Sequence, residues 1–116
     1  MTRKNRKSLR MSKATTAALQ EVKQALIDLY GVRFNQLVLY GSYARGAATA
    51  ASDVDLMVVL NDDVNPATEI ERLNSTVSDI CLRHDLLIST FPVSLVWFEQ
   101  QRSPLFLNIR REGVPL

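Results

Sequence analysis

The sequence predicts a small α/β (α+β) domain, in which a small mixed β-sheet packs with about four to five helices. In two long segments the apolar residues recur at three- and four-residue steps, which is the spacing of one helical face. Short β-prone runs between and after these segments stop at glycine, Asn-Asp or proline, as strands do. A chain of 116 residues has room for one hydrophobic core, so we expect a single domain.

The first half of the chain is expected to form helix, strand and short helix. The first helix covers residues 13–30 and ends at Gly31; its apolar face is formed by Leu19, Val22, Leu26 and Leu29. Residues 36–40 are apolar and β-prone, and they predict a strand that stops at Gly41. The alanine-rich residues 45–51 predict a short helix.

The second half is expected to form strand, helix, strand and two further helices. Residues 54–60 predict the second strand, and residues 66–83 predict a helix whose stripe is Ile70, Leu73, Val77 and Ile80. Residues 86–91 predict a third strand ended by Pro92. Ser94 caps one short helix, and Ser103-Pro104 starts the last one. The link between the first two strands is short for a parallel crossover, which favours a mixed sheet.

Basic residues gather at the start of the chain. Six of the fourteen Lys and Arg residues lie in the first 13 positions, which contain no acid. From Ala14 onward there are eight basic and twelve acidic residues, a net charge of −4. We therefore expect a basic, poorly ordered leader at residues 1–12 and a mildly acidic domain at residues 13–116. An acidic domain argues against a nucleic-acid groove within the fold.

The cysteine and histidine content and the hydropathy of the chain exclude several classes of protein. Cys81 and His84 are the only residues of their types, which excludes an internal disulfide and a Cys/His metal site. The sequence has no run of eighteen apolar residues, and its basic leader lacks the apolar stretch of a signal peptide. We expect a cytoplasmic protein without membrane contact.

Two short motifs carry the candidate chemistry. The stretch GSYARG at residues 41–46 follows a strand, so its backbone N–H groups and the Ser42 hydroxyl converge as in an anion-binding nest. Asp53 and Asp55 are two residues apart on a strand and face the same side. Paired carboxylates suit Mg²⁺ or Mn²⁺, with phosphate and water as further ligands. Taken alone, the GSYARG motif can also be a simple turn, and the two aspartates can also be the polar start of a strand. Together the two motifs suit a nucleoside triphosphate and its metal.

The run GSYARG, a five-residue spacer and SDVDLMVV resembles the minimal nucleotidyltransferases of the DNA polymerase β superfamily. The close match covers residues 37–60, and residues 106–114 are similar to the endings of small stand-alone members. The resemblance implies the nucleotidyltransferase fold, with Gly41 and Ser42 binding the nucleotide and with Asp53 and Asp55 as catalytic residues that bind Mg²⁺. Arg45 stands at a variable position, where it either reaches a phosphate or faces solvent.

Active members of this family generally add a third carboxylate from the next strand. Asp85 is the only acid available there, so it is either the third catalytic, metal-binding residue or a turn residue that enters the strand. Leu87 takes the place inside the strand where the family's acid usually lies. A two-residue displacement moves a side chain by about 6.6 Å. His84 is either a base or a partly buried histidine of the helix.

The resemblance implies an enzyme that transfers a nucleoside monophosphate, AMP from ATP, to an acceptor hydroxyl. Small members are similar to the antitoxins of toxin–antitoxin pairs with a HEPN-type helical partner, and then the acceptor is a tyrosine of the toxin. One alternative is a weak or inactive module that binds nucleotide or a partner protein; another is an RNA-modifying protein that uses the basic leader. The apolar residues 95–98 belong either to the core or to a homo-oligomer contact.

Overall fold

One mixed sheet organises the protein, as seen in a computed structural model that describes residues 11–49 and 51–116. The strand order is β3-β2-β1-β4. β1 is antiparallel to both β2 and β4, whereas β2 and β3 are parallel, so the expected mixed sheet is confirmed. The strands are β1 (Phe34–Tyr40), β2 (Val54–Leu60), β3 (Ile88–Ser94) and β4 (Val114–Pro115).

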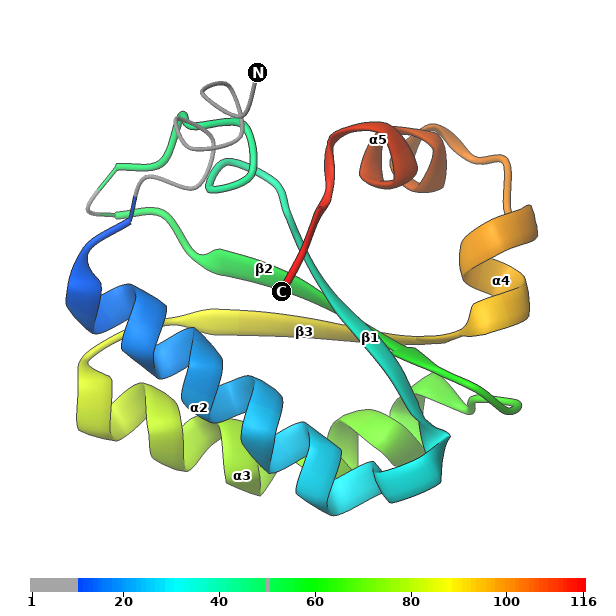
Figure 1. The fold of residues 1–116 in the computed structure, drawn as a ribbon, viewed down its shortest axis with the longest axis horizontal. Helices are drawn as coiled ribbons and strands as arrows, with labels where there is room; N and C mark the ends of the chain where they lie inside the picture. Colours follow the sequence, from blue (N-terminus) through cyan, green and yellow to red (C-terminus); the bar gives the residue numbers. More distant parts are fainter. Residues whose placement is uncertain (1–10, 50) are drawn as a thin grey trace.

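Within the described residues four α-helices pack on the two faces of this sheet (Figure 1). One face is covered by α2 (Lys13–Tyr30) and α3 (Pro66–His84), and the other by α4 (Leu95–Gln100) and α5 (Pro104–Glu112). A short 3₁₀ turn, η1 (Gly31–Arg33), leads from α2 into β1. Among the described residues, no helix combines the length and apolarity needed to cross a membrane.

Alternation along β2 divides the core into two layers and places the acidic motif. Val54, Leu56, Val58 and Leu60 pack with α2 and α3, whereas Met57 and Val59 belong to the cluster that includes α5 residues. Because side chains alternate along a strand, Asp55 lies on the same face as Met57 and Val59. The carboxylate therefore projects toward the side of the sheet that carries α4 and α5.

The capping residues explain where the helices begin and end. Ser12 caps α2 by accepting a hydrogen bond from the Thr15 N–H at 3.0 Å, and Gly31 ends that helix with a φ of +56°. Ser94 caps α4 as expected, accepting from the Trp97 N–H at 3.1 Å. Residues 1–10, most of the expected basic leader, lie outside the described residues.

The short helix expected at residues 45–51 is wrong. The backbone makes a single helical turn instead, in which the Ala47 N–H donates to the Ser42 carbonyl and the Gly46 N–H to the Tyr43 carbonyl. These are the two bonds of a Schellman motif, and Gly46 takes the left-handed φ of +72° that this motif requires. The glycine ends the helix before the alanines can extend it, so alanine propensity does not decide the structure here.

The end of the third strand was also predicted wrongly. β3 runs through Pro92 to Ser94, because it is an edge strand of the sheet and a residue without an N–H is tolerated there. At the opposite edge, β4 pairs with Val38 and Leu39 of β1. The sequence pattern did not predict β4, since two residues form a strand only when the partner lies alongside.

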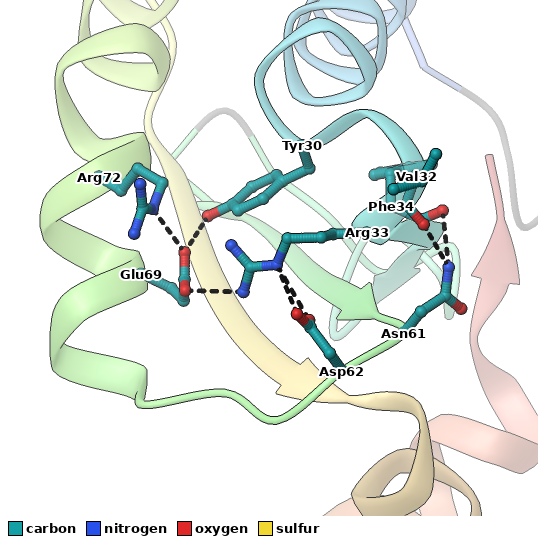
Figure 2. Close-up of polar contacts among 8 residues, drawn as sticks. All are labelled: Tyr30, Val32, Arg33, Phe34, Asn61, Asp62, Glu69 and Arg72. Atoms are coloured by element: carbon teal, nitrogen blue, oxygen red, sulfur yellow. Dashed lines mark hydrogen bonds and ion pairs between the residues drawn. The ribbon is translucent and has the colours of Figure 1, made fainter.

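At the end of the sheet that lies away from the acidic motif, the buried carboxylate of Glu69 connects several elements through hydrogen bonds (Figure 2). Only 4% of Glu69 is exposed. It accepts hydrogen bonds from the Tyr30 hydroxyl at 2.9 Å, from Arg33 Nη2 at 2.9 Å and from Arg72 Nε at 3.0 Å. Arg33 also pairs with Asp62, which follows β2. This Glu69 cluster joins α2, η1, the loop after β2 and the start of α3 through satisfied polar contacts.

Candidate active site

The turn at residues 41–46 presents free backbone donors at the end of β1. Arg45 N–H donates to the Gly41 carbonyl at 3.1 Å, which closes the first helical turn. In the described part of the chain, the preceding N–H groups of Ser42, Tyr43 and Ala44 have no acceptor. Ala44 is buried and fixes the turn on the core. Unpaired N–H groups at the start of a helical turn are the donors that bind phosphate oxygens.

Gly41 lets this turn lie directly on the carboxylate of Asp55. Tyr40 and Asp55 are register partners in the antiparallel β1–β2 pair. Gly41 has a φ of +75°, and a Cβ built on it would lie 2.3 Å from Asp55 Oδ2. A side chain at this position would therefore displace the carboxylate. The free N–H groups and the acidic motif thus meet at neighbouring strand ends.

Asp55 carries a carboxylate whose charge the fold disfavours. Burial raises the pKa of Asp55, the negative charge of Asp53 raises it further, and Arg45 acts in the opposite direction. Asp53 and Arg45 are therefore both close enough to influence Asp55. Burial and the neighbouring Asp55 charge also raise the pKa of Tyr40, so the phenol stays protonated at neutral pH. Two hard oxygen donors that repel each other fit a divalent cation such as Mg²⁺.

A cavity of about 430 Å³ lies on the β3 side of this acidic pair. Asp53 lines it from the β1–β2 connection and Asp85 lines it from the end of α3. Asp85 is the C-cap of α3, in the left-handed conformation with a φ of +51°, and β3 begins three residues later at Ile88. Within residues 11–49 and 51–116, no three His, Cys, Asp or Glu side chains lie close enough to hold one metal ion. A metal-binding role of Asp85 stays a prediction.

The family model for the nucleotidyltransferase domain matches residues 19–101. The chain belongs to this nucleotidyltransferase family. Over 97 residues it is 43% identical to the candidate protein adenylyltransferase MJ0604 of Methanocaldococcus jannaschii, which covers 83% of this chain and 91% of the relative. The protein is therefore an enzyme of the nucleotidyltransferase class.

Solved structures show the same fold at low sequence identity. A chain from the crystal structure of a toxin–antitoxin with AMP-PNP superimposes with a TM-score of 0.57 at 18% identity, covering 81% of this chain and 68% of its own. A nucleotidyltransferase candidate from Sulfolobus solfataricus superimposes with a TM-score of 0.53 at 14% identity, covering 91% of this chain and 87% of its own. The nucleotidyltransferase fold expected from the sequence is confirmed.

In this nucleotidyltransferase, Leu87 directly precedes β3 and lies beside the acidic pair. The Val54 N–H donates to the Leu87 carbonyl at 2.9 Å, and Val54 pairs with Ile88. Leu87 therefore lies level with Asp53 on the neighbouring strand, and its side chain is 68% exposed. Ser89 pairs with Asp55 in the same register. The chain next to the two aspartates thus carries a leucine just before β3 and a serine within it, and Asp85 lies outside the strand.

His84 belongs to a helix–helix contact of the nucleotidyltransferase domain. Its Nε2 lies 2.9 Å from Glu21 Oε1 on α2, and Arg83 also pairs with Glu21. The interpretation of His84 as a partly buried structural residue therefore agrees with the structure. Arg45 is exposed and influences Asp55 electrostatically, so its side chain lies near the acidic pair, and its nucleotide-binding role stays a prediction.

Sequence reasoning missed the residues of α5 that approach the turn. A cavity of about 180 Å³ is lined by Tyr40, Gly41, Arg45, Leu105, Asn108, Ile109 and Glu112. The four α5 residues follow the spacing of one helical face, which was visible in the sequence, but nothing in the pattern indicates which element that face meets.

Replacing Gly41 by alanine should lower both stability and transfer activity. The positive φ costs an L-residue about 1–2 kcal/mol, and the new methyl group would collide with Asp55 Oδ2. Chemical denaturation and the rate of nucleotidyl transfer measure the two effects. Gly31→Ala is the matched control, because Gly31 also has a positive φ but nothing lies within 4 Å of its built Cβ. Equal activity of the two variants would contradict the role assigned to the Gly41–Asp55 contact.

Proposed function

We propose that this protein transfers AMP from ATP, with Mg²⁺, to a hydroxyl group of a partner protein. The observation that carries the proposal is the seating of the Gly41 turn on Asp55, beside Asp53. It brings N–H groups that can bind phosphate oxygens close to a carboxylate pair, as a triphosphate with its metal requires. Adenylyl transfer to a protein is also what the name of the relative MJ0604 states.

In this proposal, different residues of the site bind different parts of the nucleotide. The free N–H groups that follow Gly41, with the Ser42 hydroxyl, suit the β- and γ-phosphates, and the exposed Arg45 is available to a phosphate oxygen. Asp53 and Asp55 would hold Mg²⁺ or Mn²⁺ at the α-phosphate. When bound, the ion supplies charge stabilisation for the phosphoryl group and the departing pyrophosphate.

The acceptor should approach from the β3 side. In phosphoryl transfer the attacking and leaving oxygens lie roughly in line, and the pyrophosphate is placed at the end of β1. The cavity of about 430 Å³ that is lined by Asp53 and Asp85 lies away from the Gly41 turn, next to the segment that enters β3, and supports this direction of approach. This lining supports Asp85 as a residue of the acceptor side, where a carboxylate could take the proton of the attacking hydroxyl.

The lining of this cavity favours a protein acceptor over a nucleic acid. Among the described residues that line it there is no Lys or Arg, so none of these residues would neutralise a phosphate backbone. Its rim carries two exposed leucines, Leu82 at 83% and Leu87 at 68%. An apolar rim around two acids suits a tyrosine side chain, which offers a hydroxyl on an apolar ring.

A toxin is the partner that we propose. A structural neighbour of this chain is a toxin–antitoxin solved with AMP-PNP, and the small stand-alone nucleotidyltransferases resemble antitoxins of HEPN-type helical toxins. In this role the present chain would modify a tyrosine of an all-helical partner. The expected reaction product is a tyrosine with one added AMP group.

Incubating the purified protein with α-labelled ATP, Mg²⁺ and a host-cell lysate tests the proposal. Label should appear on a protein, resist ribonuclease and fail to form when EDTA is present during the incubation. Asp85→Asn should slow labelling at saturating ATP without changing the melting-temperature shift caused by Mg²⁺-ATP. Asp63→Asn, an exposed acid outside the lining of either cavity at the site, is the matched control. Ribonuclease-sensitive label, or label that persists in EDTA, would contradict the proposal.

A second candidate function is nucleotide binding with weak or no turnover. The absence of a third acid beside Asp53 and Asp55 in the described residues favours it. In that case Mg²⁺-ATP should raise the melting temperature of the wild type, while no label reaches any protein in the lysate. Labelling that requires both aspartates would exclude this alternative.

A further inference from the structure

Helix α5 directs one stripe of side chains toward the Gly41 turn. Leu105, Asn108, Ile109 and Glu112 are spaced by three, one and three residues, so they share a helical face. Together with residues of the turn they line the cavity of about 180 Å³. Gly113 holds the end of this helix against β1, since a Cβ built there would lie 2.7 Å from Val38 Cγ1. At the top of Figure 1, α5 and the turn lie at the same end of β1.

This cavity adjoins the acidic pair through residues that lie next to Asp55. Tyr40 and Gly41 line it, and both contact the position of Asp55: Tyr40 is its register partner, and Gly41 lies against Asp55 Oδ2. Arg45 also lines the cavity and influences the Asp55 carboxylate. A group attached to a phosphate at Asp55 therefore reaches this cavity without a spacer.

Two polar groups of α5 are available inside it. Asn108 Oδ1 accepts a hydrogen bond from Arg111 Nη2 at 2.8 Å, and its amide nitrogen has no acceptor within the described residues. The carboxylate of Glu112 has no hydrogen-bond or ion-pair partner in residues 11–49 and 51–116. An ionised carboxylate only accepts hydrogen bonds. The cavity thus offers an acceptor for hydroxyl groups next to apolar side chains.

The volume and the position of the cavity indicate which part of a nucleotide would fit in it. At about 180 Å³ it is smaller than the 300–1,000 Å³ typical of sites that enclose a whole drug-sized ligand. The ribose is the group bonded directly to the α-phosphate, which the proposed function places at Asp53 and Asp55. A carboxylate is a natural partner of ribose hydroxyls, as in dinucleotide-binding folds.

We propose that the cavity between α5 and the Gly41 turn holds the ribose of the nucleotide, and that Glu112 accepts a hydrogen bond from a ribose hydroxyl. Glu112 is then a specificity-determining residue that favours ribonucleotides over deoxyribonucleotides. The assignment rests on the proposed function, because it requires a nucleoside triphosphate at the acidic pair. It adds to that function the part of the substrate that the enzyme uses for selection.

Isothermal titration with Mg²⁺-ATP, Mg²⁺-2′-dATP and Mg²⁺-3′-dATP tests the assignment. The wild type should bind ATP about tenfold more tightly than at least one deoxy analogue, as expected for a hydrogen bond to an exposed charged acceptor. Glu112→Ala should weaken ATP binding about tenfold and abolish the difference between the nucleotides. Glu112 is exposed, so the variant should fold. Glu99→Ala, which removes an exposed acid of α4, should keep the wild-type preference.

The sign of the change separates this role from a general charge effect. If Glu112 only repelled the triphosphate, Glu112→Ala would bind all three nucleotides more tightly, and the assignment would be overturned. An unchanged preference for ATP in Glu112→Ala would also overturn it while leaving the proposed function intact. If the wild type bound none of the three nucleotides, the proposed function itself would fail and the ribose assignment with it.

Discussion

Asp55→Asn should abolish nucleotidyl transfer and leave the fold at least as stable as the wild type. The metal that the two aspartates would hold contributes several kcal/mol to the transition state, so losing one of its two carboxylate ligands should lower the rate about 100- to 1,000-fold. The amide keeps the shape of the side chain. It removes the charge that makes the site bind a cation.

Stability should change in the opposite direction to activity. The folded state raises the pKa of Asp55, first by burial and then through Asp53. An acid whose pKa is raised on folding stabilises the fold only while it is protonated, and this contribution is lost as the pH rises through the folded pKa. At neutral pH the charged Asp55 therefore opposes folding, and asparagine should raise the melting temperature.

The rate of label transfer from α-labelled ATP and the calorimetric melting temperature measure the two effects together. Asp63→Asn, the exposed control, should change neither. Because the melting temperature is expected to rise, lost activity in Asp55→Asn cannot result from unfolding. A variant that keeps its activity within tenfold of the wild type would contradict the assignment of Asp55.

Glu69→Ala should lower the free energy of unfolding by about 3 kcal/mol, at the lower end of the cost of breaking a buried ion pair. The variant would leave the Tyr30 hydroxyl without its acceptor and two arginines without their shared carboxylate (Figure 2). Arg33 keeps Asp62 as a partner, and the Arg72 side chain is 47% exposed, which moderates the loss. Urea unfolding measures it.

The Glu69 cluster should also make stability sensitive to acid. Burial alone would raise the pKa of Glu69, but hydrogen bonds from Arg33, Tyr30 and Arg72 outweigh it, and the folded pKa is below its usual value of 4.5. The stabilisation is therefore complete above pH 4.5 and is lost as the pH falls through the folded pKa. Glu69→Gln should remove this acid-dependent part.

An exposed acid of the same helix supplies the control for this prediction. Glu71→Ala should change the free energy of unfolding by no more than about 0.5 kcal/mol. The cluster lies at the end of β2 away from Asp55, so the folded fraction of Glu69→Ala should keep wild-type transfer activity. An unfolding free energy equal to that of Glu71→Ala would show that the cluster contributes nothing to stability.

Local patterns predicted the elements and the two motifs. Each of these patterns determines the structure of only the few residues around it. Examples are the apolar stripe in residues 13–30, the apolar run in residues 54–60 and the turn glycine at position 41. The two-residue repeat of a strand predicted a shared face for Asp53 and Asp55; in the structure Asp55 lies in β2 and Asp53 lies just before it. For the same reason the resemblance to nucleotidyltransferases was visible before any coordinates, since its residues lie within one short segment.

Patterns failed where a distant partner decided the outcome. β3 continues through Pro92 because the strand lies at the sheet edge, and β4 exists because β1 runs beside it. The helix that alanine propensity predicted at residues 45–51 does not form, because Gly46 adopts a left-handed conformation. Asp85 looked like the first residue of a strand but ends a helix instead. β3 and β4 thus depend on a distant partner, whereas Gly46 and Asp85 adopt left-handed turn conformations that the pattern did not indicate.

The sequence by itself determined the enzyme class and predicted one end of the site, the proposed phosphate and metal end, because the residues responsible are neighbours along the chain. Only the tertiary structure decided what surrounds that end. Asp85 reaches the larger cavity through α3, and Glu112 reaches the cavity beside the Gly41 turn through α5. Their distances to Gly41 and Asp53 depend on how the helices pack on the sheet, and packing is a property of the whole chain.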